Sequence, residues 1–510
     1  MIPSSILNVA VSQFALVACF LAALKIAWDF LFSPLRNFPG PFAARFTDSW
    51  RAFWTARGDM DVTHLKWHRR YDKTAVRIGP NAVSIGDPAL IRTIYSTKNP
   101  WKKSDMYRPN DAFINGQRIS NLFNTDDDSW HNEQIKPIRG LWTMTKVLQQ
   151  EQAIDDVLTQ LLQKLDSHNG EICQMDEWLG YFAWDVTAKI SFGRPYGFLE
   201  QEKDVDNLIS DSTKGLYYFA PVSQIPWVDY LLDKNPIVRI GPQPTLTGIF
   251  YAMKVVDEYQ KQQSPTQNYD GTEHYLEKYV QLKKSNPDSA IDDNQIVSWL
   301  MLNVLAGGDT TSATMRAVVY YLGKTPNAYA KLVNELDNAR LSLPAQWTDI
   351  KGLPYLDAVL REAMRLSPGI ALIMERVVPA DGYRLPDGRF IPAGTKIGVN
   401  PAVTNRDRAV FGPDADDFNP DRWLRHDDED SIQFEARLRQ MRDVADHTFG
   451  SGSRICMGRY FAQLELWKLF ATLYSVYDLK FQDPSHEWKR FNAWFVYQWD
   501  IPMVITRRKA

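Results

Sequence analysis

The segment at residues 449–458, "FGSGSRICMG", carries the residues of this chain that are best suited to chemistry. Its cysteine, Cys456, stands where a loop turns into the helix-like run 458–477. A thiolate at a helix N-terminus is stabilised by unpaired backbone N–H groups and by the positive end of the helix dipole. Two residues earlier, Arg454 supplies a permanent cation that can pair with an anion. The pattern therefore predicts a thiolate ligand beside an anion site.

Glycines surround this cysteine and permit tight turns, which leaves room for a flat object near the backbone. They are Gly450, Gly452 and Gly458. A flat, anionic group whose metal a thiolate can hold is haem, so we predict haem with Cys456 as its axial ligand. The other two cysteines, Cys19 and Cys173, are too scattered for a disulfide framework and are predicted to be structural.

The pattern F-x-x-G-x-R-x-C-x-G over residues 449–458 resembles the haem-binding signature of the cytochrome P450 superfamily at every defining position. The resemblance implies haem b as cofactor and the cytochrome P450 fold, mainly α with a minor β-sheet. In that family the phenylalanine shields the proximal sulfur and the arginine pairs with a haem propionate. The residues of this segment that the resemblance places on haem are Phe449, Gly450, Arg454, Cys456 and Gly458.

A second motif, "LREAMRLSP" at 360–368, sets Glu362 and Arg365 on one face of a helix. Alone, such a pair is most often a solvated surface ion pair of little energetic value. Here it is similar to the E-x-x-R helix of the P450 family, and "FNPDRW" at 418–423 is similar to the family's partner segment. The resemblance implies that Glu362, Arg365 and Arg422 form a structural triad that supports the cysteine loop.

A third motif, "LAGGDTTSAT" at 305–314, lies in an apolar helical run. Two adjacent glycines in a helix interior cost about 1–2 kcal/mol relative to alanine, so we expect a local bulge that opens a groove for dioxygen. The motif is similar to the oxygen-activation motif of the family. The resemblance implies that Thr310 hydrogen-bonds the distal oxygen atom and that Asp309 relays protons from solvent.

Further haem contacts follow from the resemblance. Arg376, in "MERVVP", is expected to reach a propionate. Trp130 and His131 match the start of the family's propionate-binding helix. The arginine expected next in that helix is replaced here, and Lys136 is the candidate cation, with a surface role for Lys136 as the alternative.

The N-terminal run "ILNVAVSQFALVACFLAAL" at 6–24 has no charge and has the length of a bilayer span. A cleaved signal peptide is not favoured, because no basic residue precedes the run and no small-residue cleavage site ends it. We predict a membrane anchor at 1–32, a Pro-rich hinge at 33–44 and a haem domain at 45–510. Lys25 and Arg36 follow the run, which predicts a single-pass protein of the endoplasmic reticulum membrane with a cytoplasmic catalytic domain.

Periodicity predicts the elements of the body. Two strands are expected at 75–88 and a small sheet at 381–400, while 205–290 is weakly patterned. The segments predicted to be helical are 145–166, 176–192, 291–323, 325–338 and 354–366. The net charge of −3 provides no basic field for nucleic acid.

Scattered segments are expected to line a substrate pocket: 107–123, 208–250, the helix before Asp309, 369–374 and 493–499. The last two are apolar and aromatic, which predicts a hydrophobic small-molecule substrate. Ordinary core packing is an equally weighted explanation of the aromatic run. The resemblance extends to fungal enzymes of the pisatin demethylase-like kind.

The leading hypothesis is an NADPH-dependent monooxygenase of fungal secondary metabolism or detoxification. Because no flavin- or nicotinamide-binding glycine fingerprint follows a strand, electrons are expected from a separate NADPH–cytochrome P450 reductase, with cytochrome b5 as an optional second donor. One alternative is a P450-fold isomerase or dehydratase, although such enzymes usually lack the acid–threonine pair. The other alternative is a haem-binding sensor without turnover.

Overall fold

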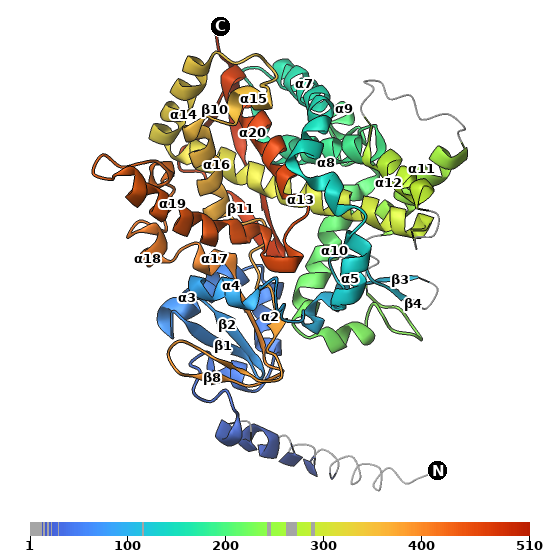
Figure 1. The fold of residues 1–510 in the computed structure, drawn as a ribbon, viewed down its shortest axis with the longest axis vertical. Coiled ribbons are helices and arrows are strands. Elements are labelled where there is room, and N and C mark those ends of the chain that lie inside the picture. The colour runs from blue at the N-terminus through green and yellow to red at the C-terminus, as the bar shows by residue number, and fades with distance from the viewer. Residues whose placement is uncertain are drawn as a thin grey trace.

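The computed structural model describes residues 13–509 except 14–15, 18–19, 22, 29, 115–116, 242–245, 262–272 and 287–290. The predicted architecture, mainly helical with small sheets, is confirmed. A large helical body is crossed by the long helix α13, and the strands β1 and β2 lie at one end of it beside α2, α3 and α4 (Figure 1).

In the first half of the chain, α2 and α3 precede the first strand, and the other helices follow it. The helices of this half are α2 (Ser49–Ala56), α3 (Met60–Arg70), α4 (Ile91–Ile94), α5 (Asp128–Ile135), α6 (Met144–Val147), α7 (Glu151–Ser167), α8 (Met175–Phe192), α9 (Phe198–Gln201), α10 (Leu208–Ser223), α11 (Leu246–Lys261) and α12 (Tyr275–Ser285). Those of the second half are α13 (Asp293–Lys324), α14 (Pro326–Ala339), α15 (Trp347–Ile350), α16 (Pro354–Leu366), α17 (Pro401–Thr404), α18 (Arg408–Phe411), α19 (Ser431–Ala445) and α20 (Arg459–Val476).

The main sheet has the strand order β1-β2-β9-β6 and a second sheet has the order β10-β13-β5. Three two-stranded hairpins pair β3 with β4, β7 with β8 and β11 with β12. The strands are β1 (Ala75–Gly79), β2 (Ala82–Ile85), β3 (Ala112–Ile114), β4 (Gln117–Ile119), β5 (Ile172–Gln174), β6 (Arg376–Val377), β7 (Tyr383–Arg384), β8 (Phe390–Ile391), β9 (Lys396–Val399), β10 (Tyr477–Phe481), β11 (Lys489–Ala493), β12 (Phe495–Trp499) and β13 (Pro502–Arg507).

The helices predicted at 176–192, 291–323, 325–338 and 354–366 appear close to their expected bounds, because local signals mark their ends. The helix predicted at 145–166 is divided, since α6 and a 3-10 turn precede α7, which begins at Glu151. Asp292 caps α13 by accepting a hydrogen bond from the backbone N–H of Gln295. Pro326 and Pro354 occupy the first positions of α14 and α16, where a missing N–H costs nothing. At the C-terminal end of α8, Gly193 takes a left-handed conformation, which residues with a side chain rarely adopt.

The predicted small sheet at 381–400 is only partly right. The segment contains the β7–β8 hairpin, but β9 leaves it and pairs with β2 in parallel and with β6 in antiparallel orientation. Ile397 and Val399 of β9 are fully buried, so the strand gains more apolar burial inside the main sheet than in a local hairpin.

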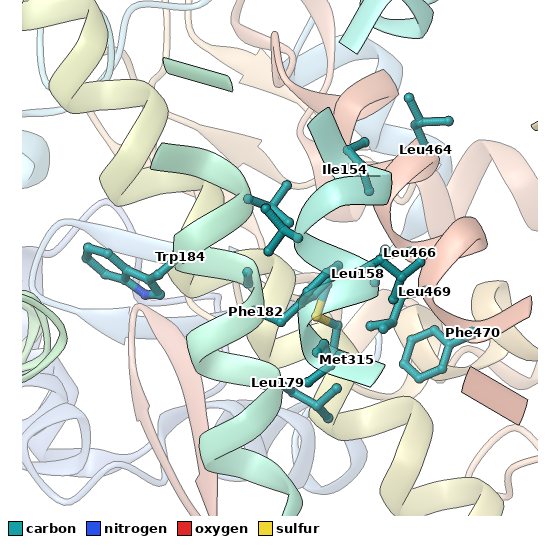
Figure 2. Close-up of a cluster of buried hydrophobic side chains, with 14 of the residues drawn as sticks. Ile154, Leu158, Leu179, Phe182, Trp184, Met315, Leu464, Leu466, Leu469 and Phe470 are labelled. Atoms are coloured by element: carbon teal, nitrogen blue, oxygen red, sulfur yellow. The ribbon is translucent and has the colours of Figure 1, made fainter. Parts of the chain in front are cut away.

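The core of the helical body is built where α7, α8, α13 and α20 meet (Figure 2). Leu158 of α7, Phe182 of α8, Met315 of α13 and Phe470 of α20 are all fully buried. In Figure 2 Trp184 projects from α8 away from this cluster. The helix α8 therefore carries core residues on one side and a polar indole N–H on another.

The adjacent glycines of α13 do not open the expected bulge, since α13 runs unbroken from Asp293 to Lys324. They instead let α8 approach closely. A Cβ atom on Gly307 would lie 2.8 Å from the methyl carbon of Thr187, and one on Gly308 would lie 2.8 Å from the ring of Trp184. The glycines thus serve helix packing at this point.

The N-terminal prediction requires correction. Most of the predicted anchor at 1–32 lies outside the described residues, and within the described residues no helix is long and apolar enough to cross a membrane. The predicted transmembrane helix and single-pass location in the endoplasmic reticulum membrane are therefore wrong on this finding.

The segment predicted to be a hinge, 33–44, packs against the main sheet. Leu35 and Phe38 are buried in the same apolar cluster as the strands. The backbone N–H of Arg77 donates a hydrogen bond to the carbonyl of Pro39, with 2.8 Å between the two atoms.

We predict that Gly308→Ala lowers the stability of the protein. The added methyl group would overlap the Trp184 ring, and overpacking of this kind costs about 1–3 kcal/mol, more than the roughly 1 kcal/mol that alanine gains in a helix. Thermal unfolding should show a lower Tm for this variant. Gly140→Ala is the control, because a Cβ atom there meets nothing within 4 Å. An unchanged or higher Tm for Gly308→Ala would contradict the packing role.

Candidate active site

The loop that carries Cys456 is shaped by two glycines in the left-handed region. Gly450 has φ +73° and Gly452 has φ +71°. A Cβ atom on Gly452 would lie 1.9 Å from the carbonyl oxygen of Tyr95, so only glycine allows this approach. The loop closes with a hydrogen bond of 2.7 Å from the Cys456 backbone N–H to the carbonyl of Phe449. Cys456 then precedes α20, as the sequence predicts.

The environment of the thiol suits a metal ligand. Burial raises the pKa of the Cys456 thiol, and backbone N–H groups of Gly458 and Arg459 oppose that rise by donating toward the sulfur. The Cys456 side chain is nevertheless accessible to solvent-sized molecules. The thiolate donor, the N–H groups aimed at the sulfur and the exposure of the side chain fit an axial ligand of haem.

Three buried cations lie close together near this loop: Arg454, Arg376 and Lys103. Arg454 pairs with Asp128 at 2.6 Å, but its Nη1 atom has no hydrogen-bond partner among the described residues. Arg376 donates to the hydroxyl of Tyr107 at 3.4 Å and to a backbone carbonyl. The ammonium nitrogen of Lys103 lies 3.6 Å from the centroid of the Tyr107 ring.

The positive charge of this group exceeds the negative charge that faces it. Burial, followed by the charges of Arg376 and Arg454, lowers the pKa of Lys103 well below its usual value. The buried carboxylate nearest in sequence, Glu375, is already engaged by Arg51 and by Ser104 at 2.7 Å. Asp128 pairs with Arg454 and, with Asp126, offsets part of the charge at Lys103. The remaining positive charge and the unpartnered guanidinium nitrogen fit an anionic group such as a pair of haem propionates.

Lys103 is a functional candidate that the sequence analysis missed. It follows Lys102, which is the same residue type and is exposed, and local sequence carries no signal that separates the two. Lys103 turns inward because it forms a β-bridge with Arg376. Tyr95 was also missed: its hydroxyl donates to the carbonyl of Met374 and accepts from the N–H of Val399, both at 2.8 Å, while its ring packs on His447.

The predicted residues of α5 divide into two groups. His131 is buried, and burial followed by the charges of Arg454 and Lys103 lowers its pKa to about 4, so it lies at the cation cluster as a neutral side chain. Trp130 is half-buried beside it. Lys136 is exposed at the C-terminal end of α5, which places it outside the buried cluster and favours the surface alternative.

Asp309 and Thr310 occupy the middle of α13. Asp309 is buried, and its carboxyl accepts hydrogen bonds from Trp184, Ser212 and Tyr497. Burial raises the pKa of Asp309, and the hydrogen bonds from these donors oppose part of that rise. The hydroxyl of Thr310 is half-buried and donates to the carbonyl of Ala306 at 2.6 Å. The donors to Asp309 were not anticipated from the sequence.

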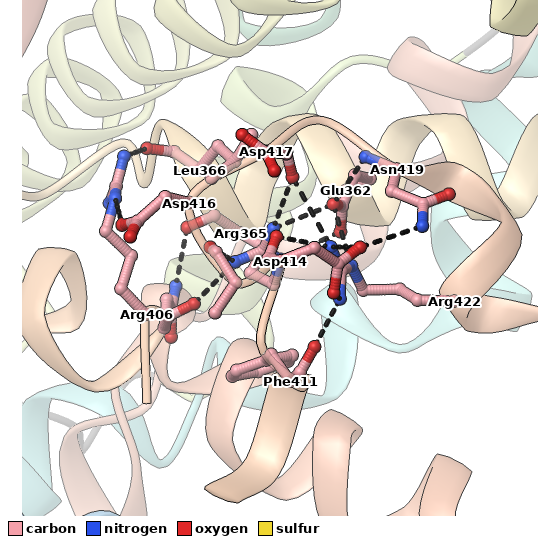
Figure 3. A network of polar contacts seen from close by, with 12 residues as sticks. Glu362, Arg365, Leu366, Arg406, Phe411, Asp414, Asp416, Asp417, Asn419 and Arg422 are labelled. Carbon is pink, nitrogen blue, oxygen red and sulfur yellow. Dashed lines mark hydrogen bonds and ion pairs between the residues drawn. The ribbon is translucent and has the colours of Figure 1, made fainter. Parts of the chain in front are cut away.

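Glu362, Arg365 and Arg422 meet in a buried network (Figure 3). The Nη2 and Nε atoms of Arg365 lie 2.7 and 2.8 Å from the two carboxylate oxygens of Glu362. Nε of Arg422 donates to the same carboxylate at 2.9 Å. Arg365 also donates to the carbonyls of Asn405 and Ala415, so the triad fastens the chain after α17 to α16.

The aromatic run 493–499 forms the tip and second strand of the β11–β12 hairpin. Trp494 has φ +83° and is buried at the tip. Its ring contacts Tyr107, Phe123 and Phe219 edge to face, with centroid separations of 5.6–5.7 Å. The hairpin thus brings together aromatic residues from three of the segments that were expected to line the pocket.

Comparison with known proteins agrees with this geometry. The family described as Cytochrome P450 matches residues 44–503. Cytochrome P450 monooxygenase cfoH of Aspergillus candidus is 34% identical over 97% of this chain and 93% of its own length. A second relative, cytochrome P450 monooxygenase AFLA_114810 of Aspergillus flavus, is 36% identical over 93% of each chain. A crystal structure of a cytochrome P450 superposes with a TM-score of 0.70 at 18% identity, covering 88% of this chain and 94% of that one.

We predict opposite effects of Lys103→Met on the haem-free protein and on haem binding. Removing a repelled buried charge should raise the Tm of the haem-free protein by about 1–2 °C, since about 1 kcal/mol shifts the Tm of a long chain by that order. The affinity for haem should fall about tenfold, because one counter-charge to the propionates is lost. Differential scanning fluorimetry and haem titration measure the two effects.

The sign of the pH dependence gives a further check of the same prediction. The pKa of Lys103 is lowered in the folded state, so between that lowered value and about pH 10 the unfolded chain binds more protons than the folded protein, and stability should rise with pH across this window. Lys103→Met should flatten this slope. Lys102→Met is the control and should change neither quantity. A fall in both stability and haem affinity on Lys103→Met would contradict the prediction.

Proposed function

Because the chain belongs to the cytochrome P450 family, whose members carry haem b on a cysteine thiolate and act as monooxygenases, we propose that Cys456 supplies the thiolate here. We propose further that the enzyme oxidises a hydrophobic small molecule by hydroxylation, epoxidation or oxidative demethylation. The observation that carries the proposal is the buried cation cluster of Arg454, Arg376 and Lys103, which lies near the cysteine loop and faces too little negative charge. A cofactor that is anionic and carries a metal would pair with the cations and bind the cysteine thiolate.

Haem, when bound, supplies the activation of dioxygen. The chain contributes binding, orientation and protons. The N–H groups of Gly458 and Arg459 stabilise the sulfur in its ionised form. Phe449 packs against the main apolar cluster next to the loop, and in this proposal its ring shields the sulfur when haem is bound. Gly450 permits the turn through its φ of +73°, since a Cβ atom there would make only an ordinary contact, 3.5 Å from the carbonyl oxygen of Arg454.

Protons reach the distal side through α13 in this proposal. The hydroxyl of Thr310 can release its bond to the Ala306 carbonyl and donate to an oxygen atom in the site. Asp309, in the next position, can replace the proton that Thr310 gives away. Electrons are proposed to come from NADPH through a separate reductase, with cytochrome b5 as an optional second donor.

The substrate is proposed to be apolar and held mainly by shape. The aromatic group of Trp494, Tyr107, Phe123 and Phe219 supports this proposal. The relatives are fungal monooxygenases, which favours secondary metabolism or detoxification. A screen of fungal metabolites for substrate-induced difference spectra would assign the chemical class, and the pisatin demethylase-like subgroup stays a prediction until then. The isomerase and sensor alternatives are less favoured, because the Asp309–Thr310 pair would serve neither.

We predict that Cys456→Ser abolishes the thiolate-type absorption band of the reduced carbon monoxide complex, because the ligand sulfur is lost. The spectrum of the purified, reduced protein under carbon monoxide measures this. Cys173→Ser is the matched control, since Cys173 is a free, buried cysteine at β5, and it should keep the band. Survival of the band in Cys456→Ser would show that another residue holds the iron.

We predict that Thr310→Ala uncouples turnover, so that product per NADPH falls several-fold while hydrogen peroxide rises, because the hydroxyl proposed to deliver the proton is lost. Reductase-supported turnover with 7-ethoxycoumarin as the probe substrate measures both products. Thr314→Ala is the control: its hydroxyl also donates to a helix carbonyl, that of Thr310 at 3.2 Å, one turn further along. Equal coupling in Thr310→Ala and the unmodified enzyme would remove Thr310 from the mechanism.

A further inference from the structure

The carboxyl of Asp309 is held by donors from three separate elements. The indole N–H of Trp184 on α8 donates to Oδ1 at 3.2 Å. The hydroxyl of Ser212 on α10 donates to Oδ2 at 2.7 Å. The hydroxyl of Tyr497 on β12 donates to the same Oδ2 at 3.0 Å. Only 3% of Asp309 is exposed, so this carboxyl depends on protein donors where water would otherwise solvate it.

Charged and titratable groups around the carboxyl come from each packed element. Arg316, about two turns further along α13, is half-buried, and its charge acts on Asp309. Nε of Arg316 donates to the backbone carbonyl of Asp176 at the start of α8, and Asp176 and Glu177 act on Arg316 in turn. On α10, Tyr217 packs edge to face on Tyr497 with 5.9 Å between ring centroids.

The two hydroxyl groups on Oδ2 differ from the indole in one chemical respect. The indole N–H can only donate, whereas a hydroxyl can donate to a carboxylate and accept from a carboxylic acid. Burial, followed by the charge of Asp309, raises the pKa of Tyr497 well above its usual value, so its hydroxyl keeps its proton. The same hydroxyl also contacts Thr213, a half-buried residue of α10. Tyr497 thus joins Asp309 to a half-buried hydroxyl-bearing residue of α10.

We propose that Tyr497 is a positioning residue for Asp309, and that with Ser212 it holds the carboxyl ionised and ready to accept a proton on its way to Thr310. This inference rests on the proposed role of Asp309 in proton delivery. In this inference the β11–β12 hairpin also positions the Asp309 carboxyl, in addition to its proposed place in the substrate pocket. Because Ser212 lies on α10, the same contact joins that helix to α13.

The first test is the pH dependence of stability of the haem-loaded enzyme. Hydrogen bonds to a carboxylate lower its pKa, so Tyr497→Phe should raise the pKa of Asp309 by on the order of half a unit to one unit. The lost hydroxyl stabilises the ionised carboxylate more than it stabilises the protonated acid. The Tm difference between the unmodified enzyme and Tyr497→Phe should therefore grow as the pH rises. In an Asp309→Asn background the difference should not depend on pH.

The second test uses the products of turnover. With reductase and 7-ethoxycoumarin, the pH below which peroxide release rises should move upward by the same half to one unit in Tyr497→Phe, and in the same direction in Ser212→Ala. Tyr329→Phe is the matched control, because the Tyr329 hydroxyl also donates to a carboxylate, that of Asp478, between α14 and β10. It should leave both pH profiles unchanged.

The outcomes separate the inference from the function on which it rests. If Asp309→Asn leaves peroxide release at the level of the unmodified enzyme, the role of Asp309 in proton delivery is wrong and the inference falls with it. If Asp309→Asn uncouples turnover but Tyr497→Phe behaves like Tyr329→Phe in both profiles, the inference alone is overturned. A Tm difference for Tyr497→Phe that is constant with pH would mean that the hydroxyl supports packing only.

Discussion

Positive charge that is buried without an equal negative charge is the constraint on which this structure depends. Arg454, Arg376 and Lys103 come from three distant parts of the chain, and burial opposes the charged form of Arg454 and of Lys103. A fold that tolerates such a cluster gives up stability, and the loss is recovered when an anion binds between the cations. The cofactor is therefore a part of the folded state in energetic terms.

Several elements must cooperate to hold these cations near the cysteine. Tyr95 touches the Gly452 turn through its backbone and packs on Arg376 through its ring, with 4.9 Å between the guanidinium carbon and the ring centroid. The Glu362 network fixes α16 to the chain after α17. Arg361, next to that network, pairs with Asp446 at 3.2 Å, directly before the cysteine loop. Sheet, helix and loop are thereby connected by polar contacts, which are directional and keep distances fixed.

The sequence predicted those parts of the fold and site whose signals are local. The helices follow from apolar periodicity and from caps such as Asp292, and the cysteine loop follows from glycines at short spacing. Lys103 could not be identified, because its inward orientation comes from a bridge with Arg376, far along the chain. The donors to Asp309 lie 97, 125 and 188 residues away from it, and no local pattern marks them. The prediction of a bulge at Gly307 and Gly308 was wrong, because side chains of α8 pack into the space that the missing Cβ atoms leave.

The same glycines explain how an acid can be buried in the centre of α13. Close approach of α8 at Gly308 brings the Trp184 ring against the helix, and its indole N–H then reaches Asp309 in the next position. A bulkier residue at 308 would push the indole away and remove one donor from the carboxyl. Helix packing and the electrostatics of the site are therefore coupled through a single contact. Because α10 and β12 supply the remaining donors, a displacement of either element changes the proton affinity of Asp309.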